Sequence, residues 1–575
     1  MADHDRTNRI TDVVKYGGSV LRDDRDLLRL AQDAYGLVRR GKRLVVVTSA
    51  FHGRTDALLA HVDPDGHASD AAAYVAIGEV ESSLRVTLAL QRAGLEAKAI
   101  PARDVGIATV GDPLDARIAS VDPQAVRRAA RGADVVVVPG FVGTDDHGAL
   151  TLLGRGGSDL TAIALAAALD AECTLVKDVD GVYERDPRGL GDEPRRFASL
   201  RFDTARSLGG RVVQRKALDH AAATGTAFRI RALCGRGGGT GTRVGGDRDE
   251  LAPRTPQRRV RVALLGLGVV GLGVYDHLRA RPDRFELVGV AVRDPARERC
   301  SEHFGRVPDD LLTSDARRLA ARADLVIEVI GGLEPPRTIA GETLARGAAF
   351  VTANKALVAE SGAALAACAL GTGGSLHHSA AVGGAVPCLE LLDRLREAGE
   401  TVVRLEGILN GTCQWIANAV ARGAAFDDAV RDAIARGYAE ADPSRDLDGI
   451  DACDKIAILA EAAFGEPPCA RVPRGLRELT AADAHAGVRL VARAWRDAER
   501  VHATVAPEPV AGTLATLGHA CGNALEVTTA RGATHVVRGI GAGRWPTAIS
   551  VIADALDACE RLVASNAART AGGVR

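Results

Sequence analysis

The sequence lacks several features that would place a protein in a specialised class. Aromatic residues make up only 3% of its 575 residues, and the ten cysteines form neither a Cys-x-x-Cys pair nor a cluster with histidine. We therefore expect no structural zinc site and no disulfide framework, and scattered reduced thiols favour the cytoplasm. The formal net charge is −1, so there is no basic excess to attract nucleic acid.

Long apolar runs are missing too. No uninterrupted apolar stretch reaches the roughly 18 residues of a membrane span, and residues 1–9 lack the apolar core of a secretion signal. We expect no membrane partner and a cytoplasmic location. With so few aromatics, the cores must be built from Val, Leu, Ile and Ala, which suits buried parallel sheets. A chain of this length exceeds one hydrophobic core, so a multidomain α/β protein is expected.

The most informative motif that is present lies in mid-chain. The run from Arg259 to Gly271 begins with the apolar pattern of a buried strand and continues directly into a Gly-x-Gly-x-x-Gly fingerprint. Such glycines make a tight turn and let the backbone approach a pyrophosphate at a helix N-terminus. The residues expected to contact the dinucleotide are Gly266, Gly268, Val269, Val270 and Gly271. Because this motif opens its own βαβ unit, residues before 259 belong to another module.

The strand expected next, over residues 285–292, bears on the choice of cofactor. It ends in Arg293 and Asp294. An arginine at this place accommodates the 2′-phosphate of NADP(H), which is favoured here, while the aspartate is compatible with NAD(H). Strands expected over 324–332 and 349–355 complete the Rossmann half and place Thr352 and Lys355 at the cofactor edge of the sheet.

The first half repeatedly places glycine or polar residues after apolar strands. One strand ends in Lys15 and is followed by two glycines, but no Walker A loop occurs. The glycine-rich segment 153–159 precedes an apolar helix expected over 160–169, an arrangement that suits an anion. Taken alone, each glycine-rich segment is typical of a plain turn. Glu79 and Asp159, taken alone, are typical of carboxylates at the start of a helix.

Four of these segments together resemble aspartokinase, a member of the amino acid kinase family. They are Lys15-Tyr-Gly-Gly-Ser19, Gly78-Glu79, Gly154-Arg-Gly-Gly-Ser-Asp159 and Asp178-Val-Asp-Gly-Val-Tyr183, within a resemblance that covers about residues 10–245. The resemblance implies phosphorylation of L-aspartate to 4-aspartyl phosphate by ATP with Mg²⁺. That chemistry depends mainly on positioning and electrostatics.

The resemblance also implies residue roles. Lys15 and Asp159 would be catalytic, with Lys15 neutralising charge on the transferred phosphoryl group. The residues implied to hold MgATP are Lys15, Gly17, Gly18, Ser19, Lys177, Asp178 and Tyr183. Those implied to hold aspartate are Thr55, Glu79, Arg155 and Ser158. Two departures concern the nucleotide: Lys177 stands where the family often has a small hydroxyl residue, and Arg211 where it has a lysine.

The last third gathers carboxylates and lysines around one expected helix, over residues 456–464. Asp451 and Lys455 are spaced i, i+4 and share a helical face, which alone indicates an ion pair. Together with segments 266–271, 352–355, 407–412 and 440–443, this pair resembles homoserine dehydrogenase. That resemblance runs from about residue 259 to 560 and implies reduction of aspartate semialdehyde to L-homoserine by NAD(P)H.

By this second resemblance, Lys455 and Lys355 would be catalytic, serving proton transfer and stabilising the developing alkoxide. We expect burial and a neighbouring cation to lower a lysine pKa toward the working pH. The residues implied to bind substrate are Glu440, Asp446 and Asp451. The family's monovalent-cation loop implies a Na⁺ held by the backbone carbonyls of Val382 and Ala385, although Ser379 stands where the family has an acid.

The expected fold is therefore α/β throughout: an N-terminal αβα sandwich of the amino-acid-kinase type, a Rossmann domain, and an α+β catalytic and dimerisation domain. The expected boundaries are 1–245 for the kinase, 246–258 for a linker, 259–383 for the Rossmann domain, 384–545 for the catalytic domain and 546–575 for a helix returning to the Rossmann domain. The linker leaves no room for a regulatory amino-acid-binding domain, so we expect no control by threonine or lysine.

Two alternatives remain open at this stage. The kinase half is either an inactive scaffold or acts on another amino acid in a specialised pathway. An active kinase half would yield an acyl phosphate, whereas the dehydrogenase needs the aldehyde, and no cysteine has a nucleophile's setting. We expect a separate semialdehyde dehydrogenase to supply the middle step, and a homodimer or higher homo-oligomer.

Overall fold

The computed structural model describes residues 10–186, 194–208, 213–233, 240–253, 259–436, 438–439, 441–469, 471–517 and 521–572. The chain divides into two compact units, one formed by residues 1–91 with 95–257 and the other by 92–94 with 258–575. The two units are described separately.

The first unit is built on a nine-stranded mixed sheet in the order β13-β10-β12-β11-β9-β1-β2-β6-β3. Its centre is parallel and strongly apolar: all five residues of β2 and of β6 are buried, as expected for a sheet covered on both faces. A smaller four-stranded sheet has the order β5-β4-β7-β8. The strands are β1 (Asp12–Tyr16), β2 (Leu44–Thr48), β3 (Ala97–Ala99), β4 (Ile107–Val110), β5 (Arg117–Val121), β6 (Val135–Pro139), β7 (Val142–Thr144), β8 (Leu150–Leu152), β9 (Glu172–Lys177), β10 (Phe197–Leu200), β11 (Phe228–Ala232), β12 (Thr242–Val244) and β13 (Glu250–Leu251).

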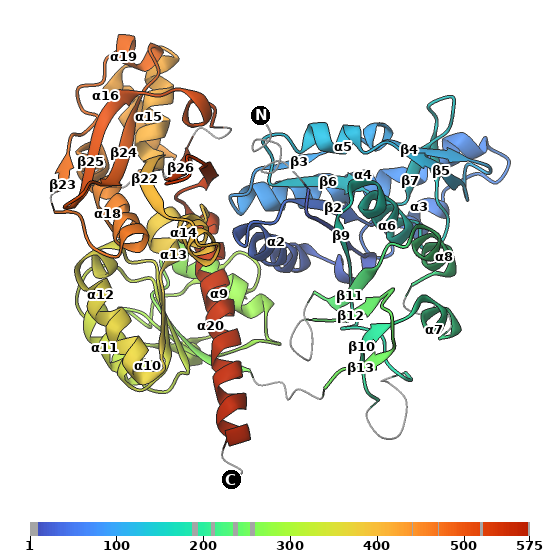
Figure 1. The fold of residues 1–575 in the computed structure, drawn as a ribbon, viewed down its shortest axis with the longest axis horizontal. Helices are drawn as coiled ribbons and strands as arrows, with labels where there is room; N and C mark the ends of the chain where they lie inside the picture. Colours follow the sequence, from blue (N-terminus) through green and yellow to red (C-terminus); the bar gives the residue numbers. More distant parts are fainter. Residues whose placement is uncertain are drawn as a thin grey trace. The chain divides into compact units, whose positions relative to one another are not determined.

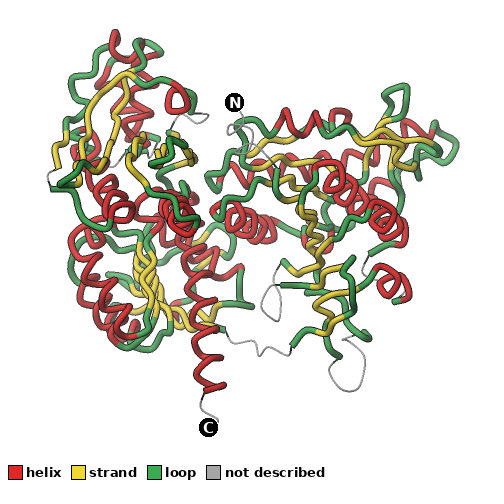
Figure 2. The backbone as a smooth tube through the Cα atoms, viewed as in Figure 1, coloured by secondary structure: helices red, strands yellow, loops and turns green. Residues whose placement is uncertain are grey.

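Helices flank this sheet, as the coloured tube of Figure 2 shows. They are α2 (Asp24–Arg39), α3 (Arg54–Leu59), α4 (Ala68–Arg92), α5 (Gln124–Ala129), α6 (Gly157–Leu169), α7 (Phe202–Ser207) and α8 (Arg215–Thr224). Helix α6 is apolar on almost every side and lies in the core between strands and α8. It begins at Gly157, three residues before the expected start, because Gly156 adopts a left-handed conformation with φ of 81° that turns the chain into the helix.

The second unit begins with a wholly parallel six-stranded sheet of order β18-β15-β14-β19-β20-β21. In chain order this is 3-2-1-4-5-6, the dinucleotide-binding arrangement. Helices α9 and α20 cover one face and α10, α11 and α12 the other (Figure 1). These elements are β14 (Val260–Leu265), α9 (Val269–Ala280), β15 (Phe285–Ala291), β18 (Leu312–Thr313), α10 (Ala316–Ala320), β19 (Leu325–Glu328), α11 (Pro336–Ala345), β20 (Ala349–Thr352), α12 (Lys355–Thr372), β21 (Ser375–His377) and α20 (Arg544–Gly572), with a hairpin of β16 (Cys300–Ser301) and β17 (Gly305–Arg306).

The rest of the second unit is a mainly antiparallel sheet of order β23-β25-β24-β22-β26-β27, packed against α15 and α18. Its elements are α13 (Ser379–Gly383), α14 (Cys388–Glu397), β22 (Val402–Ile408), α15 (Gly411–Ala421), α16 (Phe426–Ala435), α17 (Ser444–Leu447), α18 (Ile450–Phe464), β23 (Arg471–Pro473), α19 (Ala481–His485), β24 (Val488–Arg496), β25 (Val501–Pro509), β26 (Gly522–Thr529) and β27 (Thr534–Ile540). The expected α/β class, with its mixed, parallel and antiparallel sheets, is confirmed. Among the described helices, none combines the length and apolar character that a membrane crossing needs.

Candidate active sites

A large cavity of about 1280 Å³ opens in the first unit at the carboxyl ends of its central strands. Nearly all residues implied for the kinase reaction line it, although they come from segments far apart in the sequence. These lining residues are Lys15, Gly18, Ser19, Thr55, Glu79, Arg155, Ser158, Asp159, Lys177, Asp178 and Tyr183. Gly17 does not line the cavity; a Cβ there would lie 3.0 Å from the Lys15 ammonium, so glycine gives that side chain room.

Asp159 binds two lysines at the base of this cavity. Its Oδ1 lies 2.7 Å from Lys15 Nζ and its Oδ2 2.5 Å from Lys177 Nζ, and all three side chains are largely buried. Burial acts to raise the pKa of Asp159, but the two lysines outweigh it and hold that pKa below its usual value. Burial lowers the pKa of Lys15 to about 8, helped by Lys177 and opposed by Asp159. The cluster carries a net positive charge, which suits a polyphosphate.

Glu79 is the buried acid of the cavity. Its Oε1 accepts a hydrogen bond of 3.3 Å from the backbone N–H of Ala50, and its buried Oε2 accepts none from the described residues. Burial raises the pKa of Glu79 to about 7. The free oxygen leaves this carboxylate able to receive a cationic group. The helix-start interpretation of Glu79 does not apply, because the residue lies in the middle of α4.

Sequence reasoning missed several residues that line the same cavity. Ser49, His52 and Asp56 follow β2 on either side of the predicted Thr55, and Gln214 precedes α8. The signal that could have found the first three is their place after a buried strand, where parallel sheets hold ligands. Arg211 lies outside the described residues, so its place relative to the cavity is not described.

In the second unit, the three fingerprint glycines have different environments. A Cβ on Gly271 would lie 2.3 Å from the Gly266 carbonyl oxygen, and Gly266 itself has φ of 103°. Those two glycines are therefore required by the turn. A Cβ on Gly268 would meet nothing within 4 Å, so open space lies at the N-terminus of α9, where Val269 is exposed.

The other residues predicted for the cofactor differ in exposure. Arg293 is exposed immediately after β15. Thr352 is instead fully buried: its hydroxyl donates to Glu328 Oε2 at 2.6 Å and accepts from the backbone N–H of Asn354 at 3.0 Å. In this structure Thr352 supports the strand end that carries Lys355.

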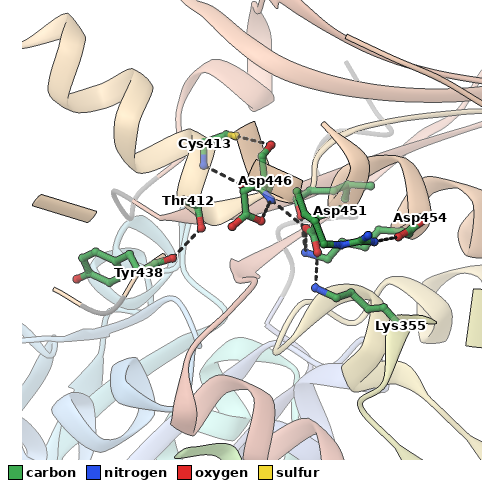
Figure 3. A network of polar contacts seen from close by, with 11 residues as sticks. Lys355, Thr412, Cys413, Tyr438, Asp446, Asp451 and Asp454 are labelled. Atoms are coloured by element: carbon green, nitrogen blue, oxygen red, sulfur yellow. Dashed lines mark hydrogen bonds and ion pairs between the residues drawn. The ribbon is translucent and has the colours of Figure 1, made fainter. Parts of the chain in front are cut away.

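Asp451 also binds two lysines, Lys355 and Lys455, and Figure 3 shows its contact with Lys355. Lys455, one helical turn along α18, lies 2.9 Å from Oδ2, and Lys355, the first residue of α12, pairs with Oδ1. Lys455 also donates to the Leu409 carbonyl at 2.8 Å. Burial favours the neutral acid, but the two lysines outweigh it and hold the pKa of Asp451 far below its usual value.

The expectation of a lowered lysine pKa is not met at Lys355. Burial works in that direction, but Asp451 outweighs it, with Asp446 and Asp454 adding to the effect, and the pKa of Lys355 is raised. The side chain is 42% exposed, so desolvation is partial. The neighbouring acids therefore favour the charged form of Lys355.

Asp446 lies in the same cluster and was expected there. Burial and the neighbouring Asp451 charge raise the pKa of Asp446. Both carboxylates accept hydrogen bonds from Asn410, a residue of the 407–412 motif for which no separate role was predicted. Glu440 lies outside the described residues, so its predicted contact with substrate is not described.

The predicted cation loop is buried. Val382 and Ala385 are 1% and 2% exposed, and the Ala385 N–H donates to the Ile540 carbonyl at 3.1 Å. The backbone N–H of Ser379 donates to Asp554 Oδ2 at 2.9 Å, so α20 brings a carboxylate to the loop where Ser379 replaces the family's acid. Among the described residues, no group of three or more His, Cys, Asp or Glu side chains gathers to hold a metal.

Comparison with known proteins explains why these two sites occur in one chain. The sequence model of the homoserine dehydrogenase NAD-binding domain matches residues 266–379, and that of homoserine dehydrogenase matches residues 387–556. Homoserine dehydrogenase of Mycobacterium tuberculosis is 38% identical over 333 residues, covering 53% of this chain and 74% of that protein. The chain belongs to the homoserine dehydrogenase family. A solved homoserine dehydrogenase from Thiobacillus denitrificans is 32% identical, with a TM-score of 0.47, and covers 53% of this chain and 74% of that one.

The first unit contains an amino acid kinase domain fused to this dehydrogenase. The amino acid kinase family model matches residues 11–231. Aspartokinase of Thermus thermophilus is 37% identical over 226 residues, which cover 38% of this chain but only 56% of that protein. The kinase match ends at residue 231 and the NAD-binding match begins at residue 266, and no regulatory amino-acid-binding domain was found.

Proposed function

We propose that the second unit reduces aspartate semialdehyde to L-homoserine with NADPH. The observation that carries this proposal is the Lys355–Asp451–Lys455 cluster, held where α12 leaves the carboxyl end of a Rossmann strand. A hydride added to the carbonyl carbon leaves negative charge on its oxygen. Two ammonium groups fixed by one carboxylate can stabilise that charge without reorganising.

The fingerprint fits a dinucleotide on this chain's own geometry. The tight Gly266–Gly271 turn and the open space beside Gly268 place α9 backbone N–H groups toward an anion. The nicotinamide cofactor supplies the hydride. Arg293, exposed after β15, is proposed to meet the 2′-phosphate of NADPH, while NADH stays the weaker alternative.

Lysine then completes the reaction. Lys355 stabilises the negative charge that develops on the carbonyl oxygen, and Lys455 donates the proton that converts this oxygen into the hydroxyl group of the product. Asp451 holds both ammonium groups in place, because it contacts each of them. Glu440 and Asp451 are proposed to bind the ammonium and hydroxyl ends of the substrate, with Asp446 as a further substrate-binding carboxylate. A cation at Val382 and Ala385 would serve only to brace this loop.

The test is NADPH oxidation with aspartate semialdehyde by the full chain and by Lys455→Met. We expect the variant to lose at least about a hundredfold in kcat because a proton donor is removed, while NADPH affinity, measured by cofactor fluorescence, stays within about twofold. Absence of reduction by the wild-type chain would refute the function. Loss of NADPH binding by the variant would refute the role given to Lys455.

We propose that the first unit phosphorylates L-aspartate with MgATP. Support comes from the cavity that gathers Lys15, Asp159 and Lys177 beside the buried Glu79. The lysine pair would neutralise the transferred phosphoryl group, Glu79 would receive the substrate ammonium, and Arg155 its carboxylate. The same chemistry would accept another small acidic amino acid, and an inactive scaffold is the remaining alternative.

The kinase assay separates these candidates. ADP formation is measured with aspartate, with glutamate and without an amino acid, for the full chain and for Lys15→Met. Aspartate-dependent turnover that disappears in the variant supports the proposal. Turnover that survives in Lys15→Met refutes the assignment of the site. If neither amino acid supports turnover, the inactive scaffold is the alternative that remains.

The setting proposed for both reactions is the cytoplasm, with small-molecule substrates, a separate semialdehyde dehydrogenase for the middle step and a homo-oligomeric assembly. The domain boundaries given above are proposed with them.

A further inference from the structure

Asn410 connects the carboxylates of the dehydrogenase cluster. It lies between β22 and α15 and is 3% exposed. Its Nδ2 donates to Asp446 Oδ1 at 2.7 Å and to Asp451 Oδ2 at 2.9 Å, while its Oδ1 accepts from the backbone N–H of Cys413 at 2.8 Å. Both amide hydrogens are therefore used on carboxylates.

The helix cap fixes this orientation. The Asn410 oxygen must face the free N–H of Cys413 at the start of α15, and the amide nitrogen then has to face the opposite way. Carboxylates accept hydrogen bonds and do not donate them when ionised, so the alternative flip would place oxygen against oxygen. The preceding residue, Leu409, gives its carbonyl to Lys455. The adjacent residues Leu409 and Asn410 thus contact Lys455 and the two carboxylates of Asp446 and Asp451.

The charges around Asp446 show what this amide can do. Asp451 and Lys455 face it from α18 and Lys355 from α12, while the Cys413 thiol donates to its backbone carbonyl at 3.2 Å. Burial and the Asp451 carboxylate favour protonation of Asp446, whereas the lysines and the hydrogen bond from Asn410 oppose it. Removing the amide hydrogen would therefore leave Asp446 harder to ionise.

We propose that Asn410 is a positioning residue for semialdehyde reduction, whose amide keeps Asp446 ionised and aimed beside the lysine pair. The inference rests on the proposed reduction. It separates two functions of one side chain: the oxygen caps α15, and the nitrogen orders the carboxylates that meet the substrate.

Asn410→Asp separates these functions. An aspartate keeps the oxygen that caps α15, loses the donor and adds a third carboxylate. We expect kcat/KM for aspartate semialdehyde at pH 7 to fall about tenfold or more, mainly through KM, because the amide group that donates to both carboxylates is lost. The acid limb of the kcat/KM pH profile should move to higher pH, since Asp446 must be ionised to bind. NADPH affinity should change less than about twofold.

Two further variants make the result decisive. Asn410→Ser keeps a capping oxygen and adds no charge. We expect it to move the acid limb of the kcat/KM profile in the same direction, but by less. If Asn410→Asp does not fold, the serine variant is used to decide the test. Asn418→Asp adds the same charge farther along α15, where its oxygen faces Arg489, and should leave the profile unchanged.

If the wild-type chain reduces the semialdehyde but both Asn410 variants keep its acid limb and KM, with only a lower unfolding midpoint, Asn410 is a simple helix cap and the proposal is wrong. If the wild-type chain does not reduce the semialdehyde, the proposed function itself fails.

Discussion

At the residue scale, the two sites share one arrangement of charged side chains, in which a buried aspartate pairs with two lysines. Asp159 holds Lys15 and Lys177, and Asp451 holds Lys355 and Lys455. A carboxylate with two cations leaves a net positive charge at a fixed position. Both proposed reactions develop or transfer negative charge, so the same solution suits an acyl phosphate and an alkoxide.

The kinase reaction should have a pH profile with two limbs. The pKa of Glu79 is raised to about 7 by burial, and an ionised Glu79 is needed to receive the aspartate ammonium, so KM for aspartate should rise as the pH falls below that value. The pKa of Lys15 is lowered to about 8, so turnover should fall as Lys15 loses its charge above it. The measurement is aspartate-dependent ADP formation from pH 6 to about 9.

Glu79→Gln is the matching variant for the acid limb. It keeps the shape and removes the titration, so KM for aspartate should be high and nearly independent of pH below about 8. An unchanged acid limb in this variant would assign that limb to another group.

Removing the shared acid of the second site should also destabilise that unit. Asp451→Asn leaves the buried Lys455 and the half-exposed Lys355 without their counter-charge, and we expect a loss of about 3 kcal/mol in the free energy of unfolding at pH 7. Because its pKa is depressed, ionised Asp451 stabilises the unit above the unfolded value of about 4, and this contribution is lost as the pH falls.

Tryptophan fluorescence in urea measures this effect selectively, since all three tryptophans, at positions 415, 495 and 545, belong to the second unit. Asp448→Asn is the control: that acid pairs with Arg477 on the surface, where ion pairs contribute little. Equal unfolding midpoints for the two variants would contradict a stabilising role for Asp451.

At the scale of elements, the dinucleotide turn allows its glycines to be separated by experiment. A methyl group on Gly271 would meet the Gly266 carbonyl, so Gly271→Ala should lower the unfolding midpoint and weaken NADPH binding together. Gly268→Ala fills open space at the start of α9 and should weaken NADPH binding by about tenfold or more with no change in the midpoint. Titration of NADPH and urea unfolding measure both quantities. Unaltered NADPH binding in Gly268→Ala would place the pyrophosphate elsewhere.

Sequence reasoning predicted the first residues of β15, β19 and β20 to within one residue but misjudged where α18 begins. The helix was expected from residue 456, because the acids before it are typical of a loop. It begins at Ile450, after Gly449 with φ of 78°, and Asp451 lies in its first turn, where the helix dipole favours a carboxylate. Residues 407–412 were recognised as a motif, yet the double contact of Asn410 could not be predicted, since it depends on how β22 meets α15 and α18.

At the scale of the whole molecule, fusion of a kinase domain to a dehydrogenase does not make the two proposed reactions consecutive. The kinase would yield an acyl phosphate, and the dehydrogenase consumes an aldehyde two electrons more reduced. We expect no NADPH oxidation when the full chain receives aspartate and MgATP, and prompt oxidation once an aspartate-semialdehyde dehydrogenase is added. Immediate oxidation without that enzyme would show a reductive step within this chain. Threonine or lysine should alter neither rate.

We also expect each activity to be lost without loss of the other. Lys15→Met should abolish ADP formation and leave semialdehyde reduction intact, and Lys455→Met should do the reverse, because the two sites belong to different compact units. Loss of both activities in either variant would indicate coupling through the fold.

The sequence by itself determined the order of the two modules, the glycine turn and the identity of the lysines, because these depend on local spacing and on backbone freedom at particular positions. The tertiary structure alone decided which charges meet. Lys355 and Asp451 are 96 residues apart in the chain, and the hydroxyl of Thr352, a residue predicted to contact the cofactor, donates to the buried Glu328 carboxylate. The raised pKa of Lys355 has the same origin: the strength of a charge pair depends on distance and burial, which only the packing of α12 against α18 fixes.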